Sequence, residues 1–216
     1  MEYPKNLEYV KASQDASDNL DMYTEATIAE SNEAITDEFG VKYSKDGRKI
    51  LEAPYELNGT YSIRKGTKII CDMAFNGCES LTDIVIPDGV TSIGDHAFCG
   101  CKSLRSIVVP DDVTGIGEYA FYDCSSLTNI AIPDGVTRIG KCAFWDCSSL
   151  NSVVIPDGVT SIGESAFNGC ESLTDIVIPN SVTSIGDGAF WRCDFPNDFK
   201  RKLSSRFGVK IFFIFF

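Results

Sequence analysis

The sequence of 216 residues has one histidine and two tryptophans. It has no run of about 18 consecutive apolar residues, the length that a membrane-spanning helix needs, so we expect no membrane span. The first eight residues lack a basic stretch followed by an apolar one, so we expect no secretory signal. The single histidine, His96, has no Ser or Cys partner that the sequence would assign to it. No nucleophile system and no catalytic residue are therefore predicted, and an enzyme is the less favoured class.

Basic residues are also scarce. The chain has 19 Lys and Arg against 31 Asp and Glu, which gives a formal net charge of -12. Ten of the acids and two of the bases lie in residues 1–40. Because an acidic surface repels phosphate backbones, we do not expect nucleic acid as a partner.

The chain does contain a 23-residue unit that recurs along most of its length. Copies begin at Ile84, Ile107, Ile130, Val153 and Ile176, and a degenerate first copy begins at Tyr61. A fixed short period is typical of a solenoid, in which each unit stacks only on its neighbours. Such a fold offers a long regular surface, which suits binding better than catalysis.

Each position of the repeat predicts part of one coil. In the second copy, Ile84 and Ile86 point to one face of a strand, and Val85 points to the other. A second extended run, residues 90–93, lies on the opposite wall, and Gly94 then turns the chain. Stacking aligns equivalent residues, so we expect one buried phenylalanine ladder: Phe75, Phe98, Phe121, Phe144, Phe167 and Phe190.

The chain divides into four segments. Residues 1–38 form an acidic leader that is partly disordered or forms one or two short helices. Residues 39–60 are predicted to be a cap hairpin that turns at Asp46-Gly47. Residues 61–193 are the solenoid. Residues 194–216 contain a short helix that ends at Gly208, then a strand over 209–212 and an aromatic tail.

The pattern I-x-I-P-x-x-V-T-x-I-G-x-x-A-F-x-x-C-x-S-L-T over residues 61–193 resembles the BspA-like leucine-rich repeat family. The resemblance implies a curved solenoid whose parallel sheet lines one face. It also implies adhesion or protein binding, commonly at the surface of bacteria or parasitic protists. We therefore predict a mainly β fold of the α/β solenoid class. It is a right-handed leucine-rich-repeat solenoid of six 23-residue repeats, with an N-terminal hairpin cap and a short C-terminal helical cap.

Cysteines and carboxylates also recur at the repeat period. Six of nine cysteines are 23 residues apart, and they could hold a metal, form disulfides or line the core. A ladder spreads ligands along a line, and its parallel Cβ vectors do not suit a disulfide, so buried thiols are favoured. Carboxylates follow the repeat Pro and the repeat Gly, where turn chemistry is favoured over a calcium ladder. We thus predict no metal and no cofactor.

Two surfaces are candidate binding sites. The first is the outward face of the main sheet, although β-branched residues also simply suit strands. Its residues are Asp83, Val85, Ser106, Val108, Asn129, Ala131, Ser152, Val154, Asp175 and Val177. The second is an edge of aromatic residues that follow the core phenylalanines, and aromatic residues dominate binding hot spots. Its residues are Tyr122, Trp145 and Trp191.

These features predict a non-catalytic binding module that mediates protein–protein interaction or adhesion through the sheet face. The expected partner is a protein or glycoprotein, and the chain itself is expected to be a monomer. The alternative is a structural spacer, or a fragment of a longer surface repeat protein. The family resemblance implies a secreted or cell-surface location, but the sequence shows no signal peptide or anchor, so the compartment stays open.

Overall fold

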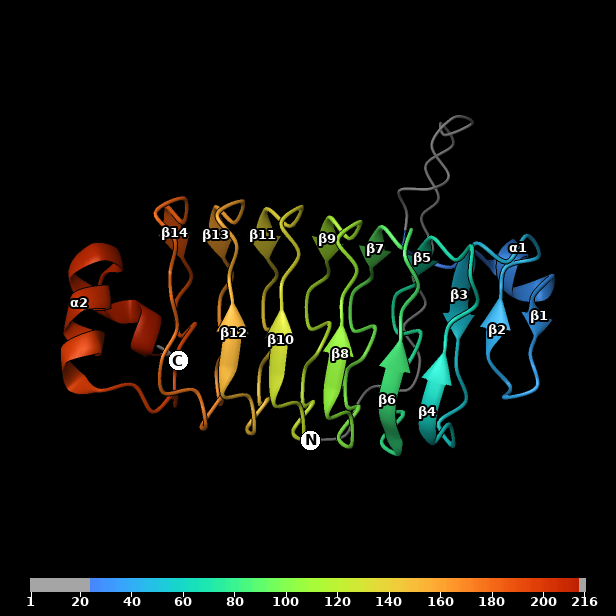
Figure 1. Ribbon diagram of the computed structural model, residues 1–216, viewed down its shortest axis with the longest axis horizontal. Coiled ribbons are helices and arrows are strands. Elements are labelled where there is room, and N and C mark those ends of the chain that lie inside the picture. Colours follow the sequence, from blue (N-terminus) through green and yellow to red (C-terminus); the bar gives the residue numbers. More distant parts are fainter. Residues whose placement is uncertain (1–23, 214–216) are drawn as a thin grey trace.

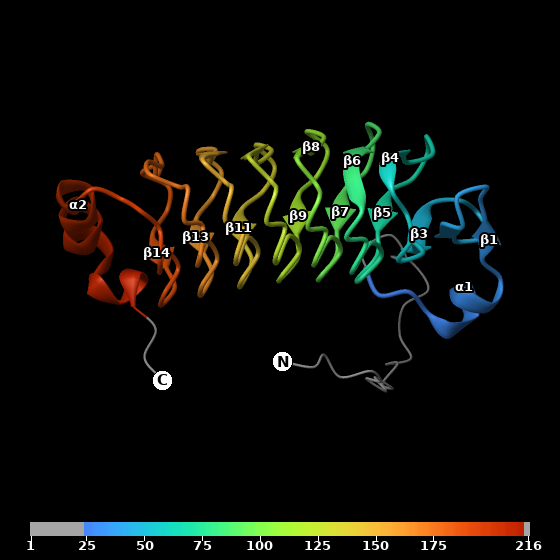
Figure 2. The ribbon, with the colours of Figure 1, turned by 90° about the horizontal axis from the view of Figure 1, so that it is seen from below.

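The computed structural model describes residues 24–213. It shows a stack of flattened coils, of which all but the last contribute one short strand to each of two walls (Figure 1). The front wall contains β4 (Gly59–Ser62), β6 (Leu81–Val85), β8 (Ser106–Val108), β10 (Asn129–Ala131) and β12 (Ser152–Val154). The back wall contains β5 (Ile69–Ile70), β7 (Ser92–Ile93), β9 (Gly115–Ile116), β11 (Arg138–Ile139), β13 (Ser161–Ile162) and β14 (Ser184–Ile185). The predicted solenoid with two walls is confirmed, and Figure 2 shows both walls from below.

Both walls are parallel sheets with a register that follows the repeat. In the front wall, with the order β12-β10-β8-β6-β4, Ile84 pairs with Ile107 and Ile130 with Val153. In the back wall, the repeat strands follow the order β5-β7-β9 and the order β11-β13-β14. Successive coils therefore pair residues that are 23 apart.

An antiparallel start caps the first coil. It is formed by β1 (Ile35–Thr36), β2 (Lys42–Tyr43) and β3 (Lys49–Glu52). The predicted hairpin is confirmed: Gly47 has a φ of 73°, and the Asp46 carboxylate accepts hydrogen bonds from the Ser44 hydroxyl and the Arg48 N–H. Positive φ carries no steric cost for glycine, which is why the turn forms there.

The described part of the acidic leader packs on this cap. A capping box at Thr27 begins the five-residue helix α1 (Ile28–Asn32). Ala26 and Ala34 pack against Leu51, Ile69 and Cys71 on the outside of the back wall. Residues 1–23, the rest of the predicted leader, lie outside the described residues.

The core is the predicted phenylalanine ladder. Neighbouring rings in the ladder lie nearly parallel, with centroids 5.2 Å apart between Phe75 and Phe98 and 5.7 Å apart between Phe167 and Phe190. All six rings are buried. Burial of each ring contributes about 1.5–3 kcal/mol of transfer free energy. Because the rings stack from coil to coil, the core is continuous along the whole solenoid.

The repeat glycines have a second role besides the predicted turn. The chain does turn there, because the Gly94 and Gly163 carbonyls accept hydrogen bonds from the N–H groups of Ala97 and Ala166. These glycines are not among the residues with positive φ, so the turn alone does not require glycine. A Cβ on Gly117 would lie 2.5 Å from the Asp95 nitrogen of the preceding coil, and one on Gly163 would lie 2.7 Å from the Lys141 nitrogen. Glycine is needed here because adjacent backbones approach too closely for a side chain.

The C-terminal end confirms one prediction and corrects another. The predicted helix is α2 (Asn197–Phe207), which ends at Gly208. The predicted strand over 209–212 is wrong, because this segment is the 3-10 helix η2 (Val209–Phe212). Its Lys210 carbonyl accepts a hydrogen bond from the Gly188 N–H, and Phe212 packs against the last ladder ring, Phe190. The segment thus supplies the next turn of the coil stack. Residues 214–216 of the aromatic tail lie outside the described residues.

The front wall begins and ends one coil earlier in the chain than predicted. Asp175–Val177, expected as its last strand, is not paired in the structure, and the sheet ends at β12. Within residues 24–213, no further coil stacks on this segment. Instead the Arg206 guanidinium of α2 binds carbonyls just beyond, including that of Val182 at 2.7 Å. At the other end the sheet gains β4, whose Ser62 pairs with Val85.

Candidate binding surfaces

The front wall carries a column of exposed apolar side chains. Val85, Val108, Val154 and Val177 are 54%, 79%, 61% and 75% exposed, and Ala131 is also exposed. They alternate with isoleucine and valine residues that are buried in the core. The strand geometry therefore places the apolar members of the predicted sheet face on the outside.

A polar column runs beside the valines. Ser106 and Ser152 are exposed, and Asp83 is partly buried. Parallel pairing holds Asp83 beside Ser106, and Asn129 beside Ser152. Asp175 is exposed, although residues 175–177 do not form a strand.

Sequence reasoning missed two residues of this face. Thr60 and Ser62 of β4 are exposed and lie beside Asp83 and Val85. The first repeat is degenerate, so its strand lacks the I-x-I-P signature that marked the others. The alternation of polar and apolar side chains over residues 59–63 is the signal that indicates a strand here.

The aromatic residues form two groups rather than one stripe. The rings of Tyr122 and Trp145 have centroids 5.7 Å apart, and Tyr119 lies 6.1 Å from Tyr122. Trp191 is set apart from them, because the coil between carries the buried Asn168 at this position. Trp191 instead contacts Phe213.

His96 lies at the end of the larger aromatic group. Its ring stacks on Tyr119 with a centroid distance of 4.7 Å. Its backbone has a φ of 56°, and its N–H donates to the Glu118 carbonyl of the next coil at 2.9 Å. Burial lowers the pKa of His96, an effect that the nearby carboxylates Asp95 and Asp72 oppose. These contacts give the imidazole a packing role between coils.

The cysteine ladder is a set of buried thiols, as predicted. All nine cysteines are reduced and buried. In addition, ladder thiols donate to phenylalanine carbonyls of the preceding coil, for example Cys101 to Phe75 and Cys147 to Phe121. Burial raises the pKa of Cys193 to about 12. Within residues 24–213, no cluster of three or more His, Cys, Asp or Glu side chains could hold a metal ion.

The carboxylates at the repeat position after the glycine connect coils; in the first coil Cys71 stands in place of that glycine. We expected each to bond its own backbone, but Asp72 accepts a hydrogen bond from the Asp95 N–H, and Asp95 accepts one from the Glu118 N–H, at 2.8 and 2.7 Å. Each of these carboxylates therefore satisfies a donor of the following coil.

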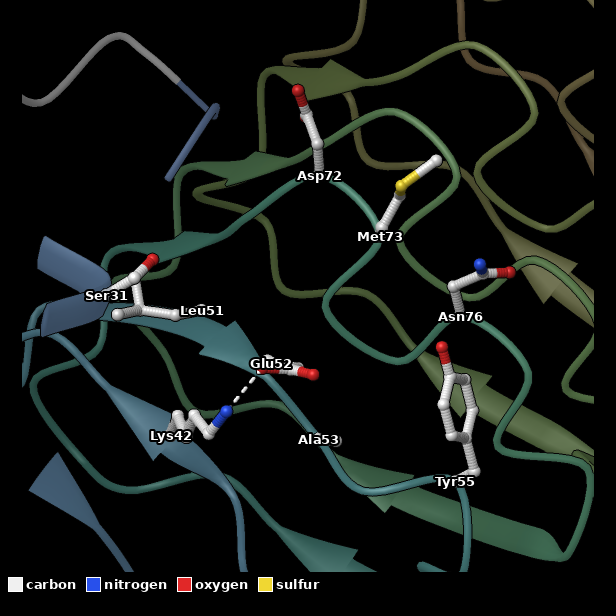
Figure 3. Close-up of a pocket in the computed structure, with 9 residues that line it drawn as sticks. All are labelled: Ser31, Lys42, Leu51, Glu52, Ala53, Tyr55, Asp72, Met73 and Asn76. Atoms are coloured by element: carbon white, nitrogen blue, oxygen red, sulfur yellow. Dashed lines mark hydrogen bonds and ion pairs between the residues drawn. The ribbon is translucent and has the colours of Figure 1, made fainter. Parts of the chain in front are cut away.

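A cavity of about 290 Å³ lies beside the N-terminal cap (Figure 3). It is lined by Ser31, Lys42, Leu51, Glu52, Ala53, Tyr55, Asp72, Met73 and Asn76. The Lys42 ammonium and the Glu52 carboxylate are paired at 2.6 Å. These two charges neutralise each other, and the Asp72 carboxylate already accepts a hydrogen bond from the Asp95 N–H, so the cavity is a weak candidate for a charged ligand.

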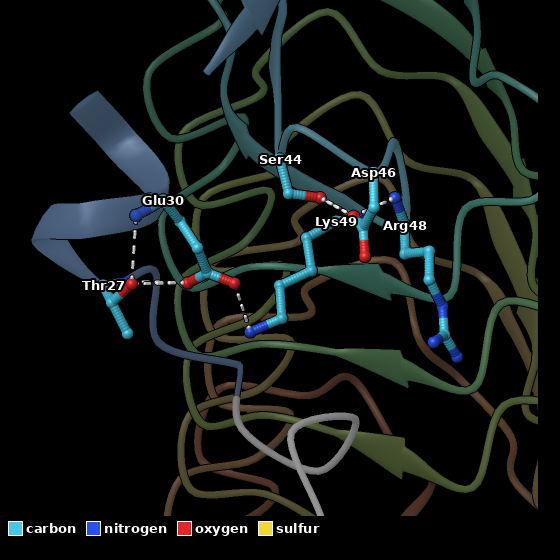
Figure 4. A network of polar contacts seen from close by, with 6 residues as sticks. All are labelled: Thr27, Glu30, Ser44, Asp46, Arg48 and Lys49. Atoms are coloured by element: carbon cyan, nitrogen blue, oxygen red, sulfur yellow. Dashed lines mark hydrogen bonds and ion pairs between the residues drawn. The ribbon is translucent and has the colours of Figure 1, made fainter. Parts of the chain in front are cut away.

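A polar network fixes the described leader to β3 (Figure 4). The buried Lys49 ammonium lies 2.9 Å from a Glu30 oxygen, and Glu30 also accepts from the N–H and hydroxyl of Thr27. Burial opposes ionisation of Glu30, but the hydrogen bonds from Thr27 and Lys49 outweigh it and lower the pKa of Glu30. The network is a structural anchor for α1.

Comparisons with known proteins agree with this architecture. The family model of the BspA type leucine rich repeat region matches residues 68–196 in six copies. The structure is similar to a leucine-rich repeat protein of T. pallidum, with 28% identity and a TM-score of 0.67 over 84% of this chain and 95% of that one. A protein of Eubacterium ventriosum has 28% identity and a TM-score of 0.59, over 76% of this chain and 50% of that one. One of Bacteroides ovatus has 26% identity and a TM-score of 0.53, over 75% and 48%.

No curated protein matches the chain. Among the helices of residues 24–213, none has the length and apolar character that a membrane crossing requires. The family match confirms the predicted resemblance, and the structural matches confirm the fold.

Proposed function

Because this chain belongs to the BspA-type leucine-rich repeat family, we propose that it is a non-catalytic binding module whose front wall recognises a protein or glycoprotein. Adhesion is the biological role that such a module would serve. The observation that carries the proposal is the column of exposed valines, of which Val108 and Val177 are more than 70% exposed. Contiguous exposed apolar residues rimmed by polar ones are typical of interaction sites.

The chemistry of the face supports a protein surface as the ligand. The apolar column supplies area that gains free energy when it leaves water, at about 25 cal/mol per Å². The neighbouring Ser106, Asn129 and Ser152 offer hydroxyl and amide groups that can donate and accept hydrogen bonds. An apolar strip with a polar margin is the common anatomy of a protein interface.

The edge aromatics are a second contact region in this proposal. Tyr122 and Trp145 form one ring pair at the edge, and Trp191 lies on another coil. Aromatic side chains supply large contact areas at low entropic cost. In this proposal a ligand seated on the front wall reaches them only if it wraps around the coil.

The test is a binding measurement with matched variants. Purified extracellular-matrix glycoproteins and serum proteins are immobilised separately, and the native chain is titrated over each. Val108→Asp/Val154→Asp places two charges on the front wall. Thr114→Asp/Thr137→Asp places the same charges at exposed positions outside the front wall. Tyr122→Ala/Trp145→Ala tests whether the edge aromatics contribute to binding.

We expect the native chain and the Thr114/Thr137 variant to bind one of these proteins equally. The Val108/Val154 variant should bind it at least tenfold more weakly while it remains folded. Equal binding by the Val108/Val154 variant would remove the front wall as the site, and loss confined to the Tyr122/Trp145 variant would assign binding to the edge. Absence of binding to every protein would favour the spacer alternative.

A further inference from the structure

The back wall of the solenoid is interrupted between β9 and β11. Within residues 24–213, its repeat strands form two sheets, β5-β7-β9 and β11-β13-β14, and no strand pairing joins them. Figure 1 shows a wider gap between β9 and β11 than between the neighbouring back-wall strands. The front wall is weaker at the same step, because β8 and β10 share one residue pair, Ser106 with Asn129, whereas β6 and β8 share three. Both walls therefore loosen between the same two coils.

Two backbone hydrogen bonds that join the other coils are absent at this β9–β11 step. At the next step, the Gly163 N–H donates to the Ile139 carbonyl and the Thr160 N–H to the Thr137 carbonyl, both at 2.9 Å. The three remaining steps have the equivalent bonds at 2.8–3.0 Å, donated by Thr91, Gly94, Thr114, Gly117, Thr183 and Gly186. Within residues 24–213, the N–H groups of Thr137 and Gly140 donate to no carbonyl of the preceding coil.

The backbones of the two coils are also further apart at this step. A Cβ on Gly140 would lie 3.1 Å from the Glu118 nitrogen of the preceding coil. At the four other repeat glycines, the same distance is 2.4–2.7 Å. A groove of about 600 Å³ lies over the step, and Ile116 and Arg138 are among the residues that line it. The missing hydrogen bonds therefore accompany a separation of the coils.

The core and one turn stay joined across the β9–β11 step. The rings of Phe121 and Phe144 are stacked with centroids 5.4 Å apart, as elsewhere in the ladder. The Tyr119 N–H donates to the Lys141 carbonyl at 2.9 Å, and the Phe121 N–H to the Ala143 carbonyl at 2.8 Å. Because these contacts persist where the walls separate, the turn that begins at Tyr119 is the axis about which one half of the stack can rotate.

The outward side chains of the back wall give a physical reason for the weak step. The outward position holds, in successive coils, Ile69, Ser92, Gly115, Arg138, Ser161 and Ser184. Only at the β9–β11 step does a glycine face a charged residue. Gly115 has no side chain for a cross-strand contact, and a glycine inside a strand weakens it. The space beside Gly115 is empty, because no atom lies within 4 Å of the place that a Cβ would occupy.

We propose that the solenoid bends at the β9–β11 step, and that Gly115 weakens the strand pairing there. Residues 24–116 and residues 139–213 are then two rigid blocks that rotate about the turn between them. In a solenoid each coil is held only by its neighbours, so one weak interface is enough to separate the motions of the two halves.

Bending would also change the shape of the front wall. Val85 and Val108 lie on the first block, and Val154 and Val177 lie on the second. Rotation of the blocks therefore changes the curvature of the valine column without moving the valines within either block. The bending itself does not depend on the function proposed for the front wall.

The test is the measurement of residual dipolar couplings of the backbone amides in the full, weakly aligned chain. The couplings of residues 24–116 and of residues 139–213 are fitted separately. Blocks that move relative to each other average their couplings to different extents, so we expect two alignment tensors that differ in magnitude by more than the fitting error. One tensor that fits both blocks would overturn the proposal, and this measurement requires no substitution.

A matched pair of variants tests the role of Gly115. Gly115→Thr places a β-branched side chain opposite Arg138, and Gly115 does not have a positive φ that would strain it. Ser161→Thr introduces the same residue at an outward position beside an intact step. In Gly115→Thr the two tensors should converge and the Gly140 amide should exchange about tenfold more slowly, whereas Ser161→Thr should keep the native values.

Tensors that stay apart in Gly115→Thr, or that converge equally in Ser161→Thr, would overturn the proposal. Both substitutions lie on the outer face of the back wall, outside the core, so loss of the fold does not obscure the result.

Discussion

The two walls of the solenoid differ in how their residues contact the neighbouring coils. On the front wall, outward side chains such as Val108 and Ser152 are exposed and form no contact that the stack requires. On the back wall, Gly163 lies against the backbone of the preceding coil, and the Asp95 carboxylate accepts an N–H of the following one. The front wall can therefore change its outward side chains at little cost in stability, whereas the back wall contains positions, such as Gly163 and Asp95, at which a change disturbs the neighbouring coil.

This difference separates the residues that build the solenoid from those available for recognition. A binding surface needs side chains that are free to differ, and the front wall supplies them. Substitutions should divide accordingly: those in the core and at the back-wall glycines should lower stability, and those on the front wall should lower binding.

The largest expected effect comes from the core that both walls share. Phe144→Ala removes one buried ring from the middle of the ladder. It should lower the free energy of unfolding by about 3–5 kcal/mol, because the rings on either side cannot close the cavity. Urea unfolding measures the change. The control Phe213→Ala truncates a half-exposed ring and should have a much smaller effect.

Protein stability at alkaline pH tests whether the cysteine thiols are buried in the folded core. An unfolded thiol has a pKa of about 8.5. Burial raises the pKa of Cys99 to about 11 and that of Cys78 to about 12. Above pH 8.5 the unfolded chain releases protons that the folded chain keeps, so stability falls as the pH rises. The slope should approach about 1.4 kcal/mol per pH unit for each such thiol.

Urea unfolding at pH 8, 9 and 10 measures this slope. Cys78→Ala should have a shallower slope than the native chain, by the contribution of one thiol. If the native chain and the Cys78→Ala variant have the same slope, Cys78 ionises equally in the folded and unfolded states.

A pair of glycine variants tests the close approach on the back wall. Gly163→Ala should destabilise the protein by about 1–3 kcal/mol, because its Cβ would lie 2.7 Å from two backbone atoms. Gly115→Ala places a Cβ where no atom lies within 4 Å, so it should be neutral or slightly stabilising. Equal midpoints in urea for the two variants would contradict the account of the back wall.

The smallest expected effect on stability is on the front wall. Val108→Asp should change the free energy of unfolding by no more than about 0.5 kcal/mol, because the side chain is exposed. A loss of several kcal/mol in urea unfolding would show that the valine column supports the fold, and the distinction between the walls would fail.

What the sequence could predict depends on repetition. The ladder of Phe144 and its equivalents, the buried Cys147 and the outward Val108 follow from residues that recur every 23 positions. A contact repeated in each coil is visible as a period. The glycines and the turns that begin at them were also predicted, but the close approach between coils at Gly163 was not, because such an approach has no local sequence signal.

The ends of the stack could not be predicted in the same way. Arg206 binds four carbonyls of the last coil, and Phe212 continues the ring stack from a 3-10 helix. Tyr61 donates to the Asp37 carboxylate and shares a hydrogen bond with the Tyr43 hydroxyl in the first coil. Each of these contacts occurs once between residues distant in the sequence, so no period reveals it.

The most direct test of the two-wall account measures binding and unfolding on the same two samples, Val108→Asp/Val154→Asp and Thr114→Asp/Thr137→Asp. The account predicts that the front-wall variant loses at least tenfold in affinity for the bound matrix or serum protein while both variants keep the native unfolding midpoint. Native affinity in the front-wall variant, or affinity lost only together with the fold, would contradict it.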